Sequence, residues 1–303
     1  MAFQYGKTYV VQPKGRHQAT IVWLHGLGDD GESWSQLLET VPLPNIKWIC
    51  PTAPTRPMTI FGGFPSTAWF DVGHLSEDGD DDIEGMDASA AHVANLLSAE
   101  PADGRFRTAL FMDIVMFRPL NPHSSILHDN ERQYIWLLKR VTMKLGVGGF
   151  SMGAATALYS ASCFVLGKYG NGSPYPVKLS AVVGLSGWLP CSKFGCYLLL
   201  VLAEDLSSLG LSGMIAGVSD AAGRILSLPI LLCHGKGDLL SIADDAVVQY
   251  KWGEKSSISL SSNGFQDLTF KSYDGLGHYT NPEEMDELCS WLTSKLGLDG
   301  RPS

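Results

Sequence analysis

The sequence predicts an α/β fold, a mostly parallel sheet with helices on both faces. Short apolar segments without polar alternation indicate strands buried on both faces. Segments with helical apolar spacing alternate with them along the chain, as in parallel α/β sheets. The predicted strands span residues 19–25, 46–50, 145–150, 179–185, 228–233 and 268–273, and the clearest helices span 32–40, 83–97 and 282–296. A chain of 303 residues is long enough for one large domain of this kind.

The predicted elements carry recognisable boundary signals. The strand at 19–25 ends in a glycine-rich turn at 26–31, and Pro51 closes the strand at 46–50. The helix at 282–296 begins with a proline followed by acidic residues, as expected of a first helical turn. Residues 52–70 have no steady period and are rich in Pro, Gly and aromatic side chains, which predicts an unusually apolar loop.

Composition excludes several functional classes. The net charge of −9 argues against nucleic-acid binding and against docking on an anionic membrane. The six cysteines form no CxxC pair and mostly lie in apolar segments, which predicts buried thiols in a reducing compartment. No apolar segment is long enough to span a bilayer, and residues 1–14 lack the apolar core of a signal peptide. We therefore expect a cytoplasmic protein, with no metal and no cofactor.

The sequence Gly-Phe-Ser-Met-Gly at residues 149–153 predicts the nucleophile. It fits G-x-S-x-G, a motif in which serine occupies a strained turn between a strand and a helix. Glycines flank such a serine because a Cβ atom would clash in the crowded backbone. Here a predicted strand precedes Ser151 and an alanine-rich helix follows it, so the structural context of the motif is present.

A nucleophilic serine needs a base, and the base needs an acid that orients it. In folds with this turn the chain order is serine, acid, histidine, and each residue follows a strand. Asp238 follows the strand at 228–233, and His278 follows the strand at 268–273. We therefore predict a triad of Ser151, Asp238 and His278.

Backbone groups are expected to stabilise the oxyanion. The glycine-rich turn after residue 25 places the N–H of Leu27 as one predicted donor, and the N–H of Met152 behind the nucleophile is the second. His25 also lies at the end of a strand, but that strand precedes the nucleophile. We therefore expect His25 to support the turn at 26–28.

Several motifs together resemble one known family. They are HGLGD at 25–29, ICPTAP at 49–54, WFD at 69–71, GFSMG at 149–153, LSGWLP at 185–190, HG at 234–235 with Asp238, and GH at 277–278. They are similar to the acyl-protein thioesterase/carboxylesterase family, also called lysophospholipase-like, and the form Phe-Ser-Met-Gly resembles its plant-type members. The resemblance runs from about Thr20 to Leu296, with interruptions.

The resemblance implies an α/β-hydrolase fold that hydrolyses thioesters of fatty-acylated cysteines and small carboxylic or lysophospholipid esters. By position it implies the same triad and the same oxyanion donors, Leu27 and Met152. The apolar loop before residue 70 matches the place of the acyl chain, so Ile60, Phe61, Phe64 and Trp69 are predicted to bind it. The alternative is that these four side chains pack the core.

The chain departs from the family pattern in three places. Within a single predicted domain, 1–303, insertions are expected at 104–143, 194–218 and 239–244. The last insertion leaves the acid open, because Asp244 takes the family position if the inserted residues begin at Asp238. A triad acid must be held rigidly, so the residue beside the strand end, Asp238, is favoured.

The predicted function is an active serine hydrolase of acylated proteins or small lipid esters, including S-palmitoyl proteins. Membrane contact is expected only at the periphery, through the substrate, and the sequence leaves the oligomeric state open. Two alternatives remain. One is a catalytically impaired isoform that acts as a binding module, since interruptions this long are uncommon in compact domains. The other is an esterase for a small ester that is not an acyl lipid.

Overall fold

The computed structural model describes residues 3–73, 81–100, 143–190, 220–237 and 247–298. The strands are β1 (Tyr9–Val11), β2 (Ala19–Leu24), β3 (Ile46–Cys50), β4 (Thr55–Pro57), β5 (Pro65–Thr67), β6 (Lys144–Phe150), β7 (Ala181–Leu185), β8 (Ile230–Gly237) and β9 (Leu268–Asp274). The helices are α1 (Gly31–Thr40), α2 (Ile83–Ser98), α5 (Met152–Leu166), α8 (Tyr250–Ser262) and α9 (Pro282–Leu296), with a 3-10 turn η1 (Thr59–Phe61).

The main sheet confirms the predicted fold class. Its strand order is β1-β3-β2-β6-β7-β8-β9, and every neighbouring pair is parallel except β1 with β3. Because the strands β3, β2, β6, β7, β8 and β9 run the same way, their carboxyl ends meet at one edge of the sheet. That edge is where ligands bind in open α/β sheets.

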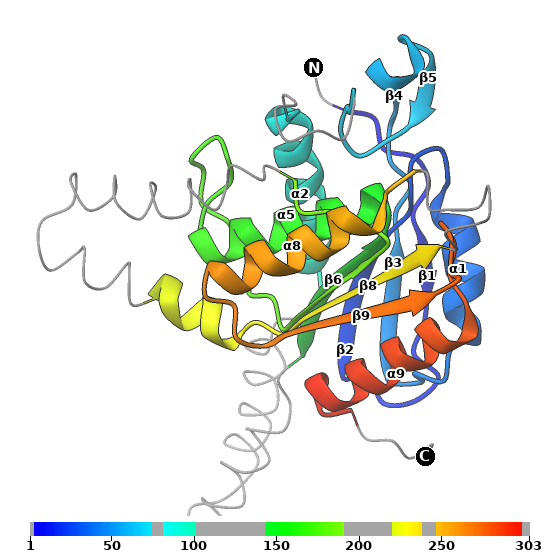
Figure 1. Ribbon diagram of the computed structural model, residues 1–303. Helices are drawn as coiled ribbons and strands as arrows, with labels where there is room; N and C mark the ends of the chain where they lie inside the picture. The colour runs from blue at the N-terminus through cyan, green and yellow to red at the C-terminus, as the bar shows by residue number, and fades with distance from the viewer. Residues whose placement is uncertain (1–2, 74–80, 101–142, 191–219, 238–246, 299–303) are drawn as a thin grey trace, which may run out of the picture.

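Helices cover both faces of the sheet, as Figure 1 shows. One apolar core lies between the sheet and α2, α5 and α8, and it includes Met86, Leu158 and Leu260. A second core lies on the opposite face, where Trp34 of α1 and Leu292 of α9 are buried against the sheet. The two cores explain why the central strands are apolar on both sides.

The predicted strand boundaries differ most from the structure at the end of β8. The sequence predicts that the strand at 228–233 ends with its apolar residues, but β8 continues to Gly237. The added residues pair with β9, where His234 lies opposite Ser272 and Gly235 opposite Tyr273. The apolar residues end at Cys233, but His234 and Gly235 are buried as well and continue the backbone pairing, so the apolar pattern alone underestimates the length of the strand.

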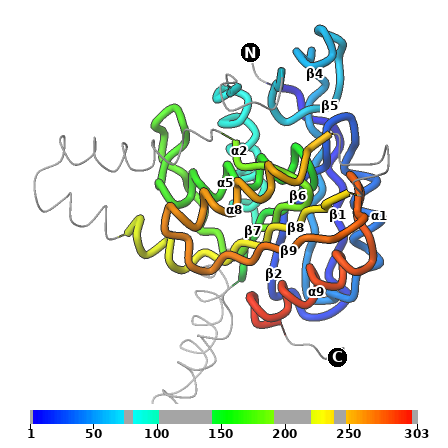
Figure 2. The backbone as a smooth tube through the Cα atoms, in the orientation of Figure 1, coloured from blue at the N-terminus to red at the C-terminus, as the bar shows by residue number. Residues whose placement is uncertain are grey.

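Residues 55–67, which we call the apolar hairpin, leave the main sheet. The strands β4 and β5 pair only with each other and stand away from the sheet in Figures 1 and 2. The connection between them carries Ile60, Phe61 and Phe64, which are 44%, 46% and 75% exposed. A group of exposed apolar side chains on one hairpin is typical of a binding surface.

The three predicted insertions lie outside the described residues, apart from Met143. Four cysteines, Cys50, Cys163, Cys233 and Cys289, are buried free thiols, as the apolar context of each predicts. Among the described helices, none combines the length and apolar character needed to cross a membrane. Across the same residues, no group of three or more His, Cys, Asp or Glu side chains is arranged to hold a metal ion.

Candidate active site

Ser151 lies on a strained turn between β6 and α5. Its φ of 56° and ψ of −121° place a non-glycine residue at positive φ. The turn is held because the N–H of Ser151 donates to the carbonyl of Leu185 at 2.8 Å. Strain of this kind persists only where the surrounding structure enforces it, and it is concentrated at functional sites.

The glycines of the motif are required by backbone packing. A Cβ atom on Gly149 would lie 2.6 Å from the carbonyl oxygen of Leu24, and one on Gly153 would lie 2.1 Å from the same oxygen. Real Cβ atoms do not approach a carbonyl this closely. The helix α5 therefore packs directly against the end of β2 only because both positions lack a side chain.

His278 meets Ser151 at the carboxyl edge of the sheet. Its Nε2 lies 2.9 Å from the Ser151 Oγ, although the two residues are 127 positions apart in the chain. The imidazole also packs against Phe150, with ring centroids 4.8 Å apart. The hydroxyl and the imidazole are thus within hydrogen-bond distance, as a nucleophile and its base must be.

The predicted acid, Asp238, lies outside the described residues, and so does the alternative, Asp244. The chain is described up to Gly237, at the end of β8. The N–H of Gly237 donates to the carbonyl of Leu276 at 3.0 Å, in the loop that carries His278. The end of β8 and the histidine loop are therefore in direct contact.

The turn that contains Leu27 lies against the nucleophile. A Cβ atom on Gly26 would lie 3.4 Å from the Cβ of Ser151. The N–H of Met152 is the first of α5 and has no acceptor within its own helix. In the residues that the structure describes, the N–H of Leu27 donates to no protein acceptor. Gly26, the residue before Leu27, thus borders Ser151, and Met152 follows Ser151 directly in the chain.

His25 supports this turn, as the sequence predicts. The N–H of Ala53 donates to its Nε2 at 3.0 Å, so the other ring nitrogen, Nδ1, carries the proton and donates to the carbonyl of Gly26 at 2.6 Å. Burial lowers the pKa of His25, which favours the neutral ring that this pattern needs. A neutral, fully buried histidine therefore fixes the start of the turn.

Trp69 differs from the other predicted acyl-binding residues. Its side chain is 1% exposed, lies in the apolar core, and donates its indole N–H to the carbonyl of His25 at 2.9 Å. The structure thus places it under the turn, as the alternative of core packing describes. Ile60, Phe61 and Phe64 remain on the exposed hairpin. An aromatic residue in an apolar loop fits both roles, and only burial separates them.

Thr67 joins the hairpin to the turn, a role that no sequence motif indicated. The N–H of Gly28 donates to the Thr67 carbonyl at 2.9 Å, and the Thr67 hydroxyl donates to the carbonyl of Asp29 at 2.7 Å. A threonine in an irregular segment has no pattern that would single it out. Its contacts are visible only once the fold brings the two loops together.

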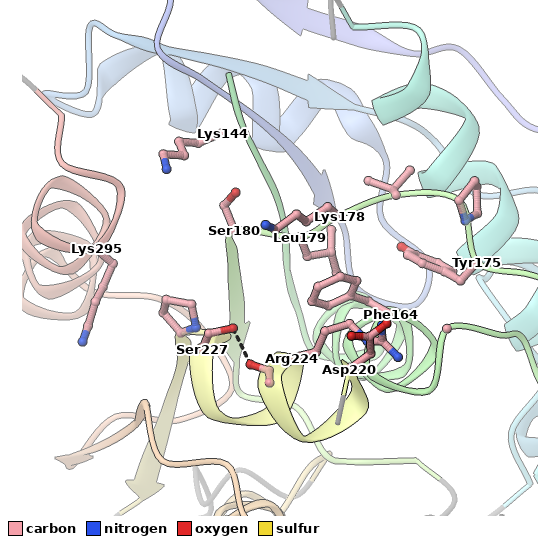
Figure 3. Close-up of a pocket in the computed structure, with 15 residues that line it drawn as sticks. Lys144, Phe164, Tyr175, Lys178, Leu179, Ser180, Asp220, Arg224, Ser227 and Lys295 are labelled. Carbon is pink, nitrogen blue, oxygen red and sulfur yellow. Dashed lines mark hydrogen bonds between the residues drawn. The ribbon is translucent and has the colours of Figure 1, made fainter. Parts of the chain in front are cut away.

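A separate cavity of about 730 Å³ lies at the other edge of the sheet (Figure 3). Its lining includes Lys144 at the start of β6, Ser180 just before β7 and Pro229 just before β8. These are the amino ends of parallel strands, whereas Ser151 follows the carboxyl end of β6. The cavity therefore does not belong to the site around Ser151.

Comparison with known proteins agrees with this arrangement. The sequence model of the phospholipase/carboxylesterase family matches residues 5–194. The crystal structure of acyl-protein thioesterase 2 from Zea mays is 56% identical, with a TM-score of 0.73, covering 97% of this chain and 100% of that one. Acyl-protein thioesterase 1 homolog 1 from Dictyostelium discoideum is 27% identical, covering 95% of this chain and 96% of its own. Lysophospholipase-like protein 1 from Mus musculus is 26% identical, with coverages of 95% and 91%.

The three relatives each match 95% or more of this chain, and the Zea mays structure agrees in both sequence and fold. The nucleophile turn lies within the segment that the family model matches. The chain belongs to the phospholipase/carboxylesterase family of α/β-hydrolases and is a serine hydrolase of esters and thioesters.

Proposed function

We propose that this hydrolase cleaves the thioester of S-acylated proteins, including S-palmitoyl proteins, and also small lipid esters, through an acyl-enzyme on Ser151. The observation that carries the proposal is the contact of 2.9 Å between the Ser151 Oγ and the His278 Nε2 on a strained turn. The Zea mays and Dictyostelium discoideum relatives are acyl-protein thioesterases, which favours the same substrate class here.

In the proposed first step, His278 accepts the hydroxyl proton through Nε2 while the Ser151 oxygen attacks the acyl carbonyl. Negative charge then develops on the carbonyl oxygen, and the N–H groups of Leu27 and Met152 stabilise it. Collapse of this intermediate forms the Ser151 acyl ester and expels the cysteine sulfur, which takes the proton from His278. Water, activated by His278 in turn, hydrolyses the acyl-enzyme and releases the fatty acid.

We propose Asp238 as the acid that orients His278 through Nδ1. The residue before it, Gly237, is bonded to the histidine loop through Leu276. In the sequence, Asp238 is the first residue after this anchored position. Asp244 stands farther along the chain from this anchored point, which makes it the weaker candidate.

The acyl chain is proposed to bind along Ile60, Phe61 and Phe64 of the apolar hairpin. These side chains are exposed, and the base of the hairpin is bonded to the turn that carries Leu27. A chain lying there would continue from a carbonyl held beside Ser151. Each methylene that it buries would contribute about 0.8 kcal/mol.

The proposal also includes the setting of the reaction. S-acylated proteins lie at membrane surfaces, so membrane contact would be peripheral and made through the substrate. The buried free thiols of the described residues fit a reducing compartment such as the cytoplasm.

The test is labelling with a fluorophosphonate probe, followed by hydrolysis of matched thioesters and oxygen esters. Ser151→Ala should remove labelling and lower kcat by a factor on the order of 10⁴ or more, while the thermal unfolding curve is kept. A chain that is folded but unlabelled would instead be the impaired isoform. Labelling with no turnover of any acyl lipid, but with hydrolysis of small esters, would favour the other alternative.

A further inference from the structure

The turn that carries Leu27 is held at both ends by side chains from a single segment. Trp69 donates its indole N–H to the His25 carbonyl at 2.9 Å, and Thr67 donates its hydroxyl to the Asp29 carbonyl at 2.7 Å. Leu27 lies midway between these two carbonyls in the chain. Any displacement of the segment that carries Thr67 and Trp69 therefore acts on the N–H of Leu27.

That segment consists of β5, the second strand of the apolar hairpin, and the residues from β5 to Trp69. Thr67 is the last residue of β5, and it pairs with Thr55 of β4. The same hairpin exposes Phe64 at 75% and Phe61 at 46%. One short element thus bears the apolar side chains at its tip and the hydrogen bonds to the oxyanion turn at its base.

The hairpin itself is a firm unit. The Asp71 carboxylate accepts from the N–H of Thr59 at 2.8 Å, close to the tip. Arg56 of β4 pairs with Asp82, the N-cap residue of α2, at 2.7 Å. Because the tip and the first strand are both anchored, a chain bound at the tip has a fixed position relative to the base.

Catalysis benefits from distant contacts only when they align the reacting atoms in the transition state. An acyl chain on the hairpin would align its carbonyl with Leu27 only if the hairpin and the turn are joined. The backbone bond from Gly28 and the Thr67 hydroxyl make that junction beside Leu27.

We propose that Thr67 is a positioning residue that sets the oxyanion turn in register with the acyl chain held on the apolar hairpin. This inference rests on the proposed function, since it assigns the hairpin to the acyl chain. Its consequence is that longer chains raise kcat, and not only the affinity for the substrate. Without the Thr67 hydroxyl, the added binding energy of a long chain appears in KM alone.

The experiment compares kcat and KM for p-nitrophenyl acetate, butyrate, octanoate and laurate. Thr67→Val keeps the shape of the side chain and removes its hydroxyl, whereas Thr67→Ser keeps the hydroxyl. Thr55→Val is the matched control, because Thr55 is the cross-strand partner of Thr67 on the same hairpin. All variants are first checked by thermal unfolding and by fluorophosphonate labelling.

We expect Thr67→Val to lower the ratio of kcat for laurate to kcat for acetate by about fivefold, the factor that one neutral hydrogen bond supplies. Thr67→Ser and Thr55→Val should keep the wild-type ratio. In a double-mutant cycle, Phe64→Ala should lower kcat for laurate in the wild type but not in Thr67→Val. That non-additivity measures the coupling between Phe64 and the Thr67 hydroxyl, even if Thr67→Val is somewhat less stable than the wild type.

An equal loss of kcat for every ester would overturn the proposal, because Thr67 would then only stiffen the turn. An unchanged ratio, or fully additive effects in the cycle, would overturn it as well. These results would leave the proposed function standing as long as Ser151 is labelled and the esters are hydrolysed. A wild-type chain that is folded, unlabelled and inactive would instead overturn both.

Discussion

The nucleophile turn and the apolar hairpin are built in opposite ways. Ser151 is 5% exposed, its N–H is bonded to the Leu185 carbonyl of β7, and the end of β2 leaves no room for a Cβ at Gly149 or Gly153. The hairpin has two strands of three residues each, and its tip is largely exposed. One region is fixed by close packing, and the other by a few hydrogen bonds from side chains. The difference teaches that the part expected to react has no space for an added side chain, whereas the part expected to choose the substrate presents exposed side chains that can be exchanged without a clash.

The largest effect on activity should come from removing the acid proposed to orient His278. We expect Asp238→Asn to lower kcat by about 10⁴-fold, because the amide would favour the wrong tautomer of His278. Asp244→Asn should change kcat little. Both variants are assayed against one thioester, with fluorophosphonate labelling as a second readout. A large loss in Asp244→Asn with little change in Asp238→Asn would contradict the choice of acid.

Breaking the packing at the nucleophile turn should cost stability as well as activity. In Gly153→Ala the new methyl group would lie 2.1 Å from the Leu24 carbonyl oxygen, so β2 or α5 must move. We expect the free energy of unfolding to fall by about 3 kcal/mol or more. Urea unfolding measures this, and Gly223→Ala is the control, since a Cβ there meets nothing within 4 Å. Equal stability of the two variants would show that the turn is less constrained than its geometry indicates.

How much the sequence could predict follows from the same contrast. The lack of space for a Cβ requires glycine at positions 149 and 153, and these two glycines form a motif from which the turn and Ser151 could be predicted. The order of strands along the chain brought His278 to the same edge. The hairpin leaves no such mark, because strands of three residues are too short to show a period. The bonds of Thr67 and Trp69 to distant carbonyls depend on the fold, so neither role could be read from local pattern.

Away from the hairpin, Glu284 in the first turn of α9 is a buried carboxyl group without a hydrogen-bond donor in the described residues. Its side chain is fully buried, and neither carboxylate oxygen meets a donor in the part of the chain that the structure describes. Burial raises its pKa from 4.5 to about 8, and the thiol of Cys233 lies on the neighbouring strand β8. Between pH 4.5 and about pH 8, the carboxyl group of Glu284 is therefore protonated in the folded protein and ionised in the unfolded chain.

The free energy of unfolding should therefore fall as pH rises from about 4.5 to 8, by up to about 1.4 kcal/mol per pH unit. Glu284→Gln keeps the size of the side chain and cannot ionise, so its stability should lack this fall. Urea unfolding of both proteins across that pH range makes the comparison. Glu283→Gln, on the same helical turn but exposed, is the control. Parallel curves for wild type and Glu284→Gln would show that the carboxyl group is ionised in the fold.

The smallest effect is expected at the hairpin tip, and it concerns selectivity alone. Phe64 is 75% exposed, so Phe64→Ala should change the free energy of unfolding by less than about 0.5 kcal/mol. If its ring covers the acyl chain, kcat/KM for laurate should fall by about fivefold, the equivalent of roughly one buried methylene or slightly more. The value for acetate should stay the same, because so short a chain does not reach the tip.

Ile258→Ala is the matched control for Phe64→Ala, since Ile258 is an exposed apolar residue of α8, 61% exposed and outside the hairpin. It should leave the chain-length profile unchanged. Equal losses for laurate and acetate in Phe64→Ala would mean that the tip supports the turn instead of binding the chain. No loss for either ester would place the acyl chain elsewhere. The hairpin would then not select the substrate, and only the packing of the reacting region would remain of the contrast.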